Sequence, residues 1–202
     1  MHGQLHIIST GQQSIDTFST IVAAIHKDVD AIHIREKTWT ATELMKTVQR
    51  LVDLGVPLHK IIINDRVDVA YVMGTKGVQL AHHSIDVARV KENFPSLQIG
   101  CSVHSVTEAL QAEVNGADYI LYGHVFPTRS KPGLPPKGLQ RLSQLVQHVH
   151  VPVIAIGGMT PKRTADVLAT GAHGIAVLSG VLLADHPQKA VKAYARALQR
   201  RR

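Results

Sequence analysis

The chain lacks most of what marks a secreted or membrane-bound protein. It has one cysteine, Cys101, among 202 residues, which excludes an internal disulfide and is typical of a reducing compartment. No apolar run approaches the roughly 20 residues that a membrane span needs. The first residues also lack the basic and apolar segments of a secretory signal. We therefore expect a cytoplasmic protein with no membrane partner.

Aromatic side chains are scarce as well, with one Trp, three Phe and four Tyr. This scarcity argues against a surface on which nucleic-acid bases stack. The net charge of +7 would suit either a nucleic acid or a small anionic substrate. Much of the charge lies at the end, in KAYARALQRRR, which we interpret as a solvated final helix. We expect an anionic small molecule as the partner; the sequence is compatible with a homo-oligomer.

The length suits one domain, and no low-complexity linker divides the chain. Short β-type runs alternate with amphipathic helical stretches, which indicates parallel strands joined by crossover helices. Both a (β/α)8 barrel and a doubly wound open sheet have this pattern. A count of eight runs favours an α/β fold with a single TIM-barrel domain over residues 1–202. The runs are residues 5–9, 31–36, 60–64, 77–81, 98–103, 119–124, 152–158 and 174–179.

Capping residues and glycines mark where helices should begin and end. Thr40 with Glu43, and Ser105 with Glu108, match the capping box, in which a hydroxyl and a Glu three residues later satisfy free backbone N–H groups. Glycines stand where three helices should stop: Gly55, Gly116 and Gly171.

Polar residues and glycines gather where the β-type runs end. TIM barrels carry their chemistry at the carboxyl ends of the strands. Any one of these residues alone would serve as a cap or a loop contact, but all of them should meet on one rim. Glycines after the last two runs should leave backbone N–H groups open to a phosphate. The rim residues are Arg35, Glu36, Lys37, Asn64, Asp65, Arg66, Gln79, His82, Ser102, His104, His124, Gly157, Gly158, Ser179 and Gly180.

Metal-binding patterns are absent from the sequence. It contains no HExxH motif and no Cys/His cluster, and we expect no structural metal and no other cofactor. Period-two alternation places Cys101 on the face of its strand opposite Ser102. We interpret Cys101 as a small core residue under the helices, and not as a nucleophile.

Seven motifs, in order over nearly the whole chain, resemble those of thiamine phosphate synthase. They are HIREK (33–37), INDR (63–66), GVQLAHHS (77–84), GCSVHS (100–105), GADYILYGHVFPTRSK (116–131), PVIAIGGM (152–159) and GIAVLSG (174–180). The resemblance implies a (β/α)8 barrel that joins a pyrimidine diphosphate to a thiazole phosphate with Mg²⁺. The resemblance also implies that Arg35, Lys37 and Asn64 bind the diphosphate and that Asp65 is a Mg²⁺ ligand. It implies that Thr128, Ser130 and Lys131 belong to a flexible loop, and that Gly158 and Ser179 bind the thiazole phosphate.

Two positions depart from the synthase pattern. The family's fourth-strand motif resembles GVHLGQED and ends in a second Mg²⁺ carboxylate, where this chain has Ser84. The family's GPxFPT is GHVFPT here, so His124 replaces a proline. The loss of one metal ligand and the gain of one acid–base group make the sequence similar to the thiazole tautomerase branch of the same superfamily. Members of that branch aromatise a carboxythiazole phosphate tautomer.

From these departures we predict an isomerase, a thiazole tautomerase of thiamine biosynthesis acting on a phosphorylated thiazole. His124 would accept a proton and return it nearby, because an imidazole with an ordinary pKa near 6.5 suits both roles. No metal is assigned. The predicted substrate-binding residues are Arg35, Asn64, Ser102, Lys131, Gly157, Gly158, Ser179 and Gly180.

Three alternatives stay open at this point. The first is the Mg²⁺-dependent synthase itself. The second is a non-catalytic regulatory protein on the same barrel, touching nucleic acid through its basic end, although no recognition motif for nucleic acid appears. The third is another phosphate-binding barrel isomerase, which rests on analogy of fold alone.

Overall fold

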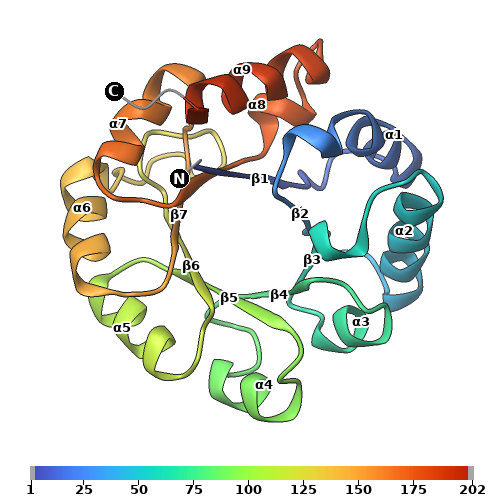
Figure 1. The fold of residues 1–202 in the computed structure, drawn as a ribbon, viewed down its shortest axis with the longest axis horizontal. Helices are drawn as coiled ribbons and strands as arrows, with labels where there is room; N and C mark the ends of the chain where they lie inside the picture. The colour runs from blue at the N-terminus through green and yellow to red at the C-terminus, as the bar shows by residue number, and fades with distance from the viewer. Residues whose placement is uncertain (1–2, 200–202) are drawn as a thin grey trace.

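Eight parallel strands close into a barrel, with helices around the outside, in the computed structural model, which describes residues 3–199 (Figure 1). Each strand pairs with the next along the chain, and β8 (Gly174–Val177) pairs with β1 (Gln4–Ile8) to close the ring. The predicted α/β TIM barrel is confirmed. The last three arginines of the predicted final helix lie outside the described residues.

The strands match the predicted runs to within two residues at every end. The remaining strands are β2 (Ala31–Ile34), β3 (Ile61–Asn64), β4 (Gly77–Leu80), β5 (Gln98–Val103), β6 (Tyr119–Gly123) and β7 (Val153–Ile156). The helices are α1 (Ile15–Ile25), α2 (Ala41–Asp53), α3 (Val67–Val72), α4 (Val87–Asn93), α5 (Val106–Val114), α6 (Gly138–His148), α7 (Thr164–Ala169), α8 (Ser179–Leu182) and α9 (Pro187–Gln199). Single 3₁₀ turns lie at η1 (His26–Asp28), η2 (Leu58–Lys60) and η3 (Pro161–Arg163).

The strands bury apolar side chains on both faces, as parallel strands between two layers do. Ile32 and Ile34 pack outward into the large cluster under the helices, and Cys101 packs against the same cluster. Ile62 and Leu121 pack into a smaller cluster inside the barrel. Burial on both faces leaves the strand ends as the places where polar side chains reach solvent.

The predicted caps form, with one difference in detail. The Thr40 hydroxyl accepts from the Glu43 N–H at 3.3 Å, and the Glu43 carboxylate accepts from the Thr40 N–H at 2.7 Å. At α5 the Ser105 hydroxyl accepts from the Glu108 N–H, but the Glu108 carboxylate reaches one residue further, to the N–H of His104. The three predicted stop glycines adopt the left-handed φ that ends helices: Gly55, Gly116 and Gly171.

The amino-terminal half of the barrel interior is polar. His6 Nδ1 lies 3.0 Å from His33 Nε2, and His6 Nε2 lies 3.1 Å from the Gln4 carbonyl oxygen Oε1. The Tyr119 ring packs edge-on against His6 at 5.8 Å between centroids. Burial, with the nearby Lys76 charge, lowers the pKa of His33 to about 3, and burial holds the pKa of His6 well below its ordinary value. Both rings are therefore neutral near pH 7.

No helix among residues 3–199 is both long enough and apolar enough to cross a membrane.

The neutral histidines predict a loss of stability in acid. An unfolded histidine titrates near 6.5, so between pH 6.5 and 3 the unfolded chain binds protons that the folded chain excludes. As the pH falls across that window, His33 should lower the free energy of unfolding by up to about 1.4 kcal/mol per pH unit, and His6, whose pKa is also lowered, should add to this loss. His33→Gln should reduce this slope in urea-unfolding curves, whereas the exposed-site control His59→Gln should keep it. A wild-type slope in His33→Gln would contradict the assignment.

Candidate active site

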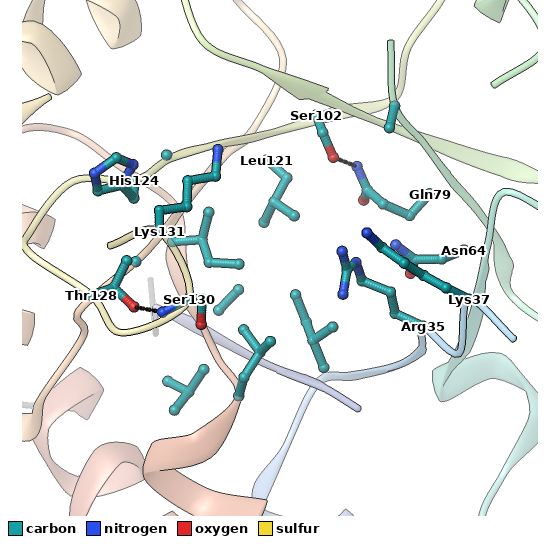
Figure 2. A pocket seen from close by; sticks show the side chains of 18 of the residues that line it. Arg35, Lys37, Asn64, Gln79, Ser102, Leu121, His124, Thr128, Ser130 and Lys131 are labelled. Carbon is teal, nitrogen blue, oxygen red and sulfur yellow. Dashed lines mark hydrogen bonds between the residues drawn. The ribbon is translucent and has the colours of Figure 1, made fainter. Parts of the chain in front are cut away.

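A pocket of about 760 Å³ opens at the carboxyl ends of the strands. Figure 2 shows its lining side chains converging from separate strands and from the loop after β6. All of the predicted site residues line this pocket: Arg35, Asn64, Ser102, His124, Lys131, Gly157, Gly158, Ser179 and Gly180. Their roles stay predictions.

One side of the pocket is cationic. Arg35 and Lys37 follow β2 and lie beside Asn64 at the end of β3 (Figure 2). The backbone N–H of Arg35 donates to the Ser9 hydroxyl at 2.8 Å, which fixes where its side chain begins. The ion pairs found between residues 3 and 199 use neither of these cations. Their charge is therefore available to an anionic ligand.

Glycines line the side of the pocket that is formed by the turns after β7 and β8. Gly157 has φ +100°, and a Cβ there would lie 2.3 Å from the Cβ of His124. Gly158 has φ +65°, and a Cβ there would lie 2.4 Å from the Pro127 carbonyl oxygen. Neither position has room for a side chain, because the turn packs closely against the start of the β6 loop, and both glycines line the pocket with backbone alone. Gly180, at the start of α8, lies on the same side.

The pocket floor between these two sides is apolar. Ile8, Leu121 and Ala176 belong to the cluster inside the barrel, and Ile156 packs against it. All four line the pocket. An uncharged ring lying here would bury apolar surface at about 25 cal/mol per Å².

A loop after β6 covers part of the pocket. It is fastened at its base, because the N–H of Lys137 donates to the His124 carbonyl at 2.9 Å and the N–H of Gly138 donates to that of Val125 at 3.0 Å. Within the loop, the Thr128 hydroxyl accepts from the Ser130 N–H. Lys131 lies on the far side of the pocket from Arg35 (Figure 2).

His124 lies at the root of this loop and is 6% exposed. Its Nε2 lies 3.2 Å from the Leu134 carbonyl oxygen. A carbonyl only accepts, so this contact requires a proton on Nε2. The imidazole therefore holds the loop against the strand end. Neighbouring His104 donates in the same way, from Nδ1 to the Gly123 carbonyl at 2.9 Å.

The rim offers a partial site for Mg²⁺. Asp65 follows Asn64 in a left-handed conformation with φ 68°, and it lines the pocket. The Ser84 hydroxyl accepts from the Ala81 N–H at 2.8 Å, so a hydrogen-bonded turn occupies the place of the family's second carboxylate. Residues 3–199 contain no group of three or more His, Cys, Asp or Glu that could hold a metal alone. One carboxylate fits Mg²⁺ when a ligand's phosphates supply further oxygens.

The structure adds two residues that had no assigned role. The Tyr119 hydroxyl donates to Gln79 Oε1 at 2.7 Å, and Gln79 Nε2 donates to Ser102 Oγ at 3.0 Å. Gln79 is one of the polar residues at the predicted strand ends, and this polarity is the sequence signal that indicates it. Tyr119 belongs to an apolar run that predicts a buried strand, and no sequence pattern indicates that its hydroxyl contacts Gln79.

Comparison with known proteins identifies relatives over most of the chain. A family model described as thiamine monophosphate synthase matches residues 5–181. The thiamine-phosphate synthase of Chloroflexus aurantiacus is 40% identical over 172 residues, covering 83% of this chain and 78% of its own. The thiamine-phosphate synthase of Pyrococcus horikoshii is 34% identical over 199 residues, which cover 97% of this chain and 95% of its own.

Solved structures agree with these sequence relatives. Thiamine phosphate pyrophosphorylase from Pyrococcus furiosus superposes with a TM-score of 0.83 at 33% identity, over 97% of this chain and 95% of that one. A 3-hexulose-6-phosphate synthase, with a TM-score of 0.73 at 16% identity, shares the fold alone.

These relatives correct the predicted activity. The prediction of a thiazole tautomerase, and of an isomerase in general, is contradicted by the synthase names of relatives up to 40% identical. They agree instead with the first alternative, the synthase. The tautomerase prediction depends on the family residues that Ser84 and His124 replace. In the structure, both side chains form hydrogen bonds to the backbone instead.

Cys101 packs on the helix side of β5, and its reactivity tests the interpretation of this residue as a core side chain. Burial, together with Glu108 and Asp86, raises the pKa of its thiol from 9.0 to about 11. The thiolate is the reactive form, so iodoacetamide at pH 7.5 should label the folded chain about 10- to 100-fold more slowly than the urea-unfolded chain. Labelling followed by mass spectrometry measures both rates, and Cys101→Ala gives the background. Equal rates would show a reactive, accessible thiol.

Proposed function

Because the chain belongs to the thiamine monophosphate synthase family, we propose that it is a thiamine-phosphate synthase, a transferase that joins a pyrimidine diphosphate to a thiazole phosphate. The observation that carries the proposal is the pair of anion-binding sides in one pocket. Arg35 and Lys37 lie on one side, and the glycine turns of Gly157 and Gly158 lie on the other. Joining a diphosphate to a phosphate needs two such sites, and the paired cations on one side suit the larger charge of the diphosphate.

The cationic side suits the diphosphate. Arg35 presents a planar fork that matches phosphate oxygens in pairs, and Lys37 adds a mobile point charge. Asn64 adds an amide group close to both. In the coupling step the bond to the diphosphate breaks, and negative charge grows on the departing group. Fixed positive groups aimed at that charge stabilise the transition state.

Asp65 is the residue that would hold Mg²⁺ beside the diphosphate. It is exposed at the rim, one residue after Asn64. Bound Mg²⁺ supplies further neutralisation of the diphosphate charge. With Ser84 in place of a second carboxylate, this chain leaves more of the ion's coordination to the ligand and to water.

The glycine side suits the thiazole phosphate. Gly157, Gly158 and Gly180 bring backbone close to the pocket, and the exposed Ser179 adds a hydroxyl. His124 contributes by holding the loop that carries Lys131. The apolar floor between the two sides would then bring the two rings into contact and exclude water from the bond that forms.

A coupling assay tests the proposal. The purified chain, given pyrimidine diphosphate, thiazole phosphate and Mg²⁺, should form thiamine phosphate and should stop when EDTA is added. Arg35→Gln should lower kcat/KM by about 10²- to 10³-fold, because it removes a fixed charge from the leaving group. The control Arg89→Gln, on the exposed surface of α4, should leave the rate unchanged. A wild-type chain that forms no thiamine phosphate at any Mg²⁺ concentration would refute the proposal.

A further inference from the structure

Arg163 lies behind the glycine turn that follows β7 and contacts the pocket wall from outside. It ends η3, and its Nη1 donates to the Gly158 carbonyl at 2.6 Å. Its Cζ also lies over the Phe126 ring, 4.6 Å from the ring centroid. Gly158 lines the pocket, whereas Arg163 does not. One cation therefore holds the turn after β7 and the start of the β6 loop together.

Chemistry determines the direction of the hydrogen bond that Arg163 forms. A guanidinium only donates and a carbonyl only accepts, so the Gly158 carbonyl points toward Arg163. In a trans peptide the N–H points opposite to the carbonyl, and the N–H of Met159 therefore points away from Arg163. The preceding peptide is fixed as well, because the Gly157 carbonyl accepts from the Phe126 N–H at 3.1 Å. The Gly158 N–H therefore points away from the β6 loop.

These two consecutive N–H groups have no acceptor of their own. Neither the Gly158 N–H nor the Met159 N–H takes part in the hydrogen bonds found among residues 3–199. Met159 is 7% exposed, and both residues line the pocket. Buried backbone N–H groups nearly always have a partner, and consecutive N–H groups in a turn form the kind of hollow that binds anions. The turn therefore offers two donors to a phosphate.

The charge of Arg163 reaches this turn without a neutralising carboxylate. The ion pairs found within residues 3–199 do not include Arg163, and its side chain is half-buried. A charged donor on a carbonyl forms a stronger hydrogen bond and polarises the peptide. The N–H at the other end of that peptide then becomes a better donor. The positive charge thus acts on a phosphate through the Gly158–Met159 peptide.

We propose that Arg163 is a positioning residue that aims the N–H groups of Gly158 and Met159 at the phosphate of the thiazole substrate and strengthens them as donors. This inference rests on the proposed function for the identity of the phosphorylated ligand. Arg163 itself touches no substrate. Its loss should weaken phosphate binding on the glycine side of the pocket and leave the cationic side of Arg35 and Lys37 unchanged.

The first test removes the charge and the donor together. In Arg163→Met, the Kd of thiazole phosphate, measured by calorimetry, should rise about 10-fold. The Kd of the pyrimidine diphosphate should not change, and neither should that of the thiazole alcohol, which lacks the phosphate. Arg163→Lys keeps the charge and a donor but loses the planar group that stacks on Phe126. Its Kd for thiazole phosphate should rise by a smaller factor, and it carries the same comparison if Arg163→Met does not fold.

Two control variants separate this role from simpler ones. Lys162→Met removes the same charge from the exposed neighbouring residue of η3, so it measures the effect of distant charge alone. Tyr194→Phe removes the hydrogen bond that the Tyr194 hydroxyl donates to the Met159 carbonyl at 2.9 Å. That carbonyl belongs to the next peptide of the turn, whose N–H is on Thr160, outside the pocket lining. Both controls should bind thiazole phosphate as the wild type does.

A second test follows the two N–H groups directly and needs no coupling activity. Inorganic phosphate added to the ¹⁵N-labelled wild type should move the amide proton resonances of Gly158 and Met159 downfield. At saturation, these shifts should be smaller in Arg163→Met and unchanged in Lys162→Met.

The inference is overturned if Arg163→Met and either control weaken thiazole phosphate binding equally, or if both substrates lose affinity together. It is also overturned if phosphate shifts neither resonance in the wild type, or shifts both equally in Arg163→Met. A wild-type chain that does not couple the two substrates would refute the proposed function separately. The resonance shifts with inorganic phosphate would then still decide whether Arg163 positions the turn.

Discussion

Closure of the eight strands is the constraint on which the pocket depends. Most side chains on both faces of the strands are apolar, so the strands are buried between the barrel interior and the helices, and the polar side chains that reach solvent are left at the strand ends. The strands are parallel and in sequential order, so all the carboxyl ends meet on one rim. Arg35 and Gly158, far apart in the sequence, therefore line the same pocket. An open sheet of the same strands would spread these residues along an edge.

The barrel interior is less uniform than a packed aliphatic core. Its amino-terminal half holds His6 and His33 in contact, and Tyr119 links this half to Gln79 and the pocket floor. Buried polar groups are costly unless they are hydrogen-bonded, and most of these are paired. Their burial is the reason that the histidines stay neutral.

Much of the fold could be predicted from the sequence, because apolar runs and stop glycines are local signals. Gly55 and Gly116 end helices for reasons visible in their own neighbourhoods. The rim residues could also be predicted, since fold topology brings strand ends together. The hydrogen bond of Tyr119 could not, because it depends on the register of three strands and on the missing side chain of Gly100. The isomerase prediction was wrong for a related reason: His124 was judged by residue type, without its contact to the Leu134 carbonyl.

The central claim is that one pocket binds two anions on opposite sides, with a neutral floor between them. The most direct measurement is a crystal structure of the chain with Mg²⁺, thiazole phosphate and an unreactive analogue of the pyrimidine diphosphate. The account predicts the diphosphate within hydrogen-bond distance of Arg35 and the thiazole phosphate against Gly158 and Ser179. Both anions on the same side, or either one bound outside the pocket, would contradict it.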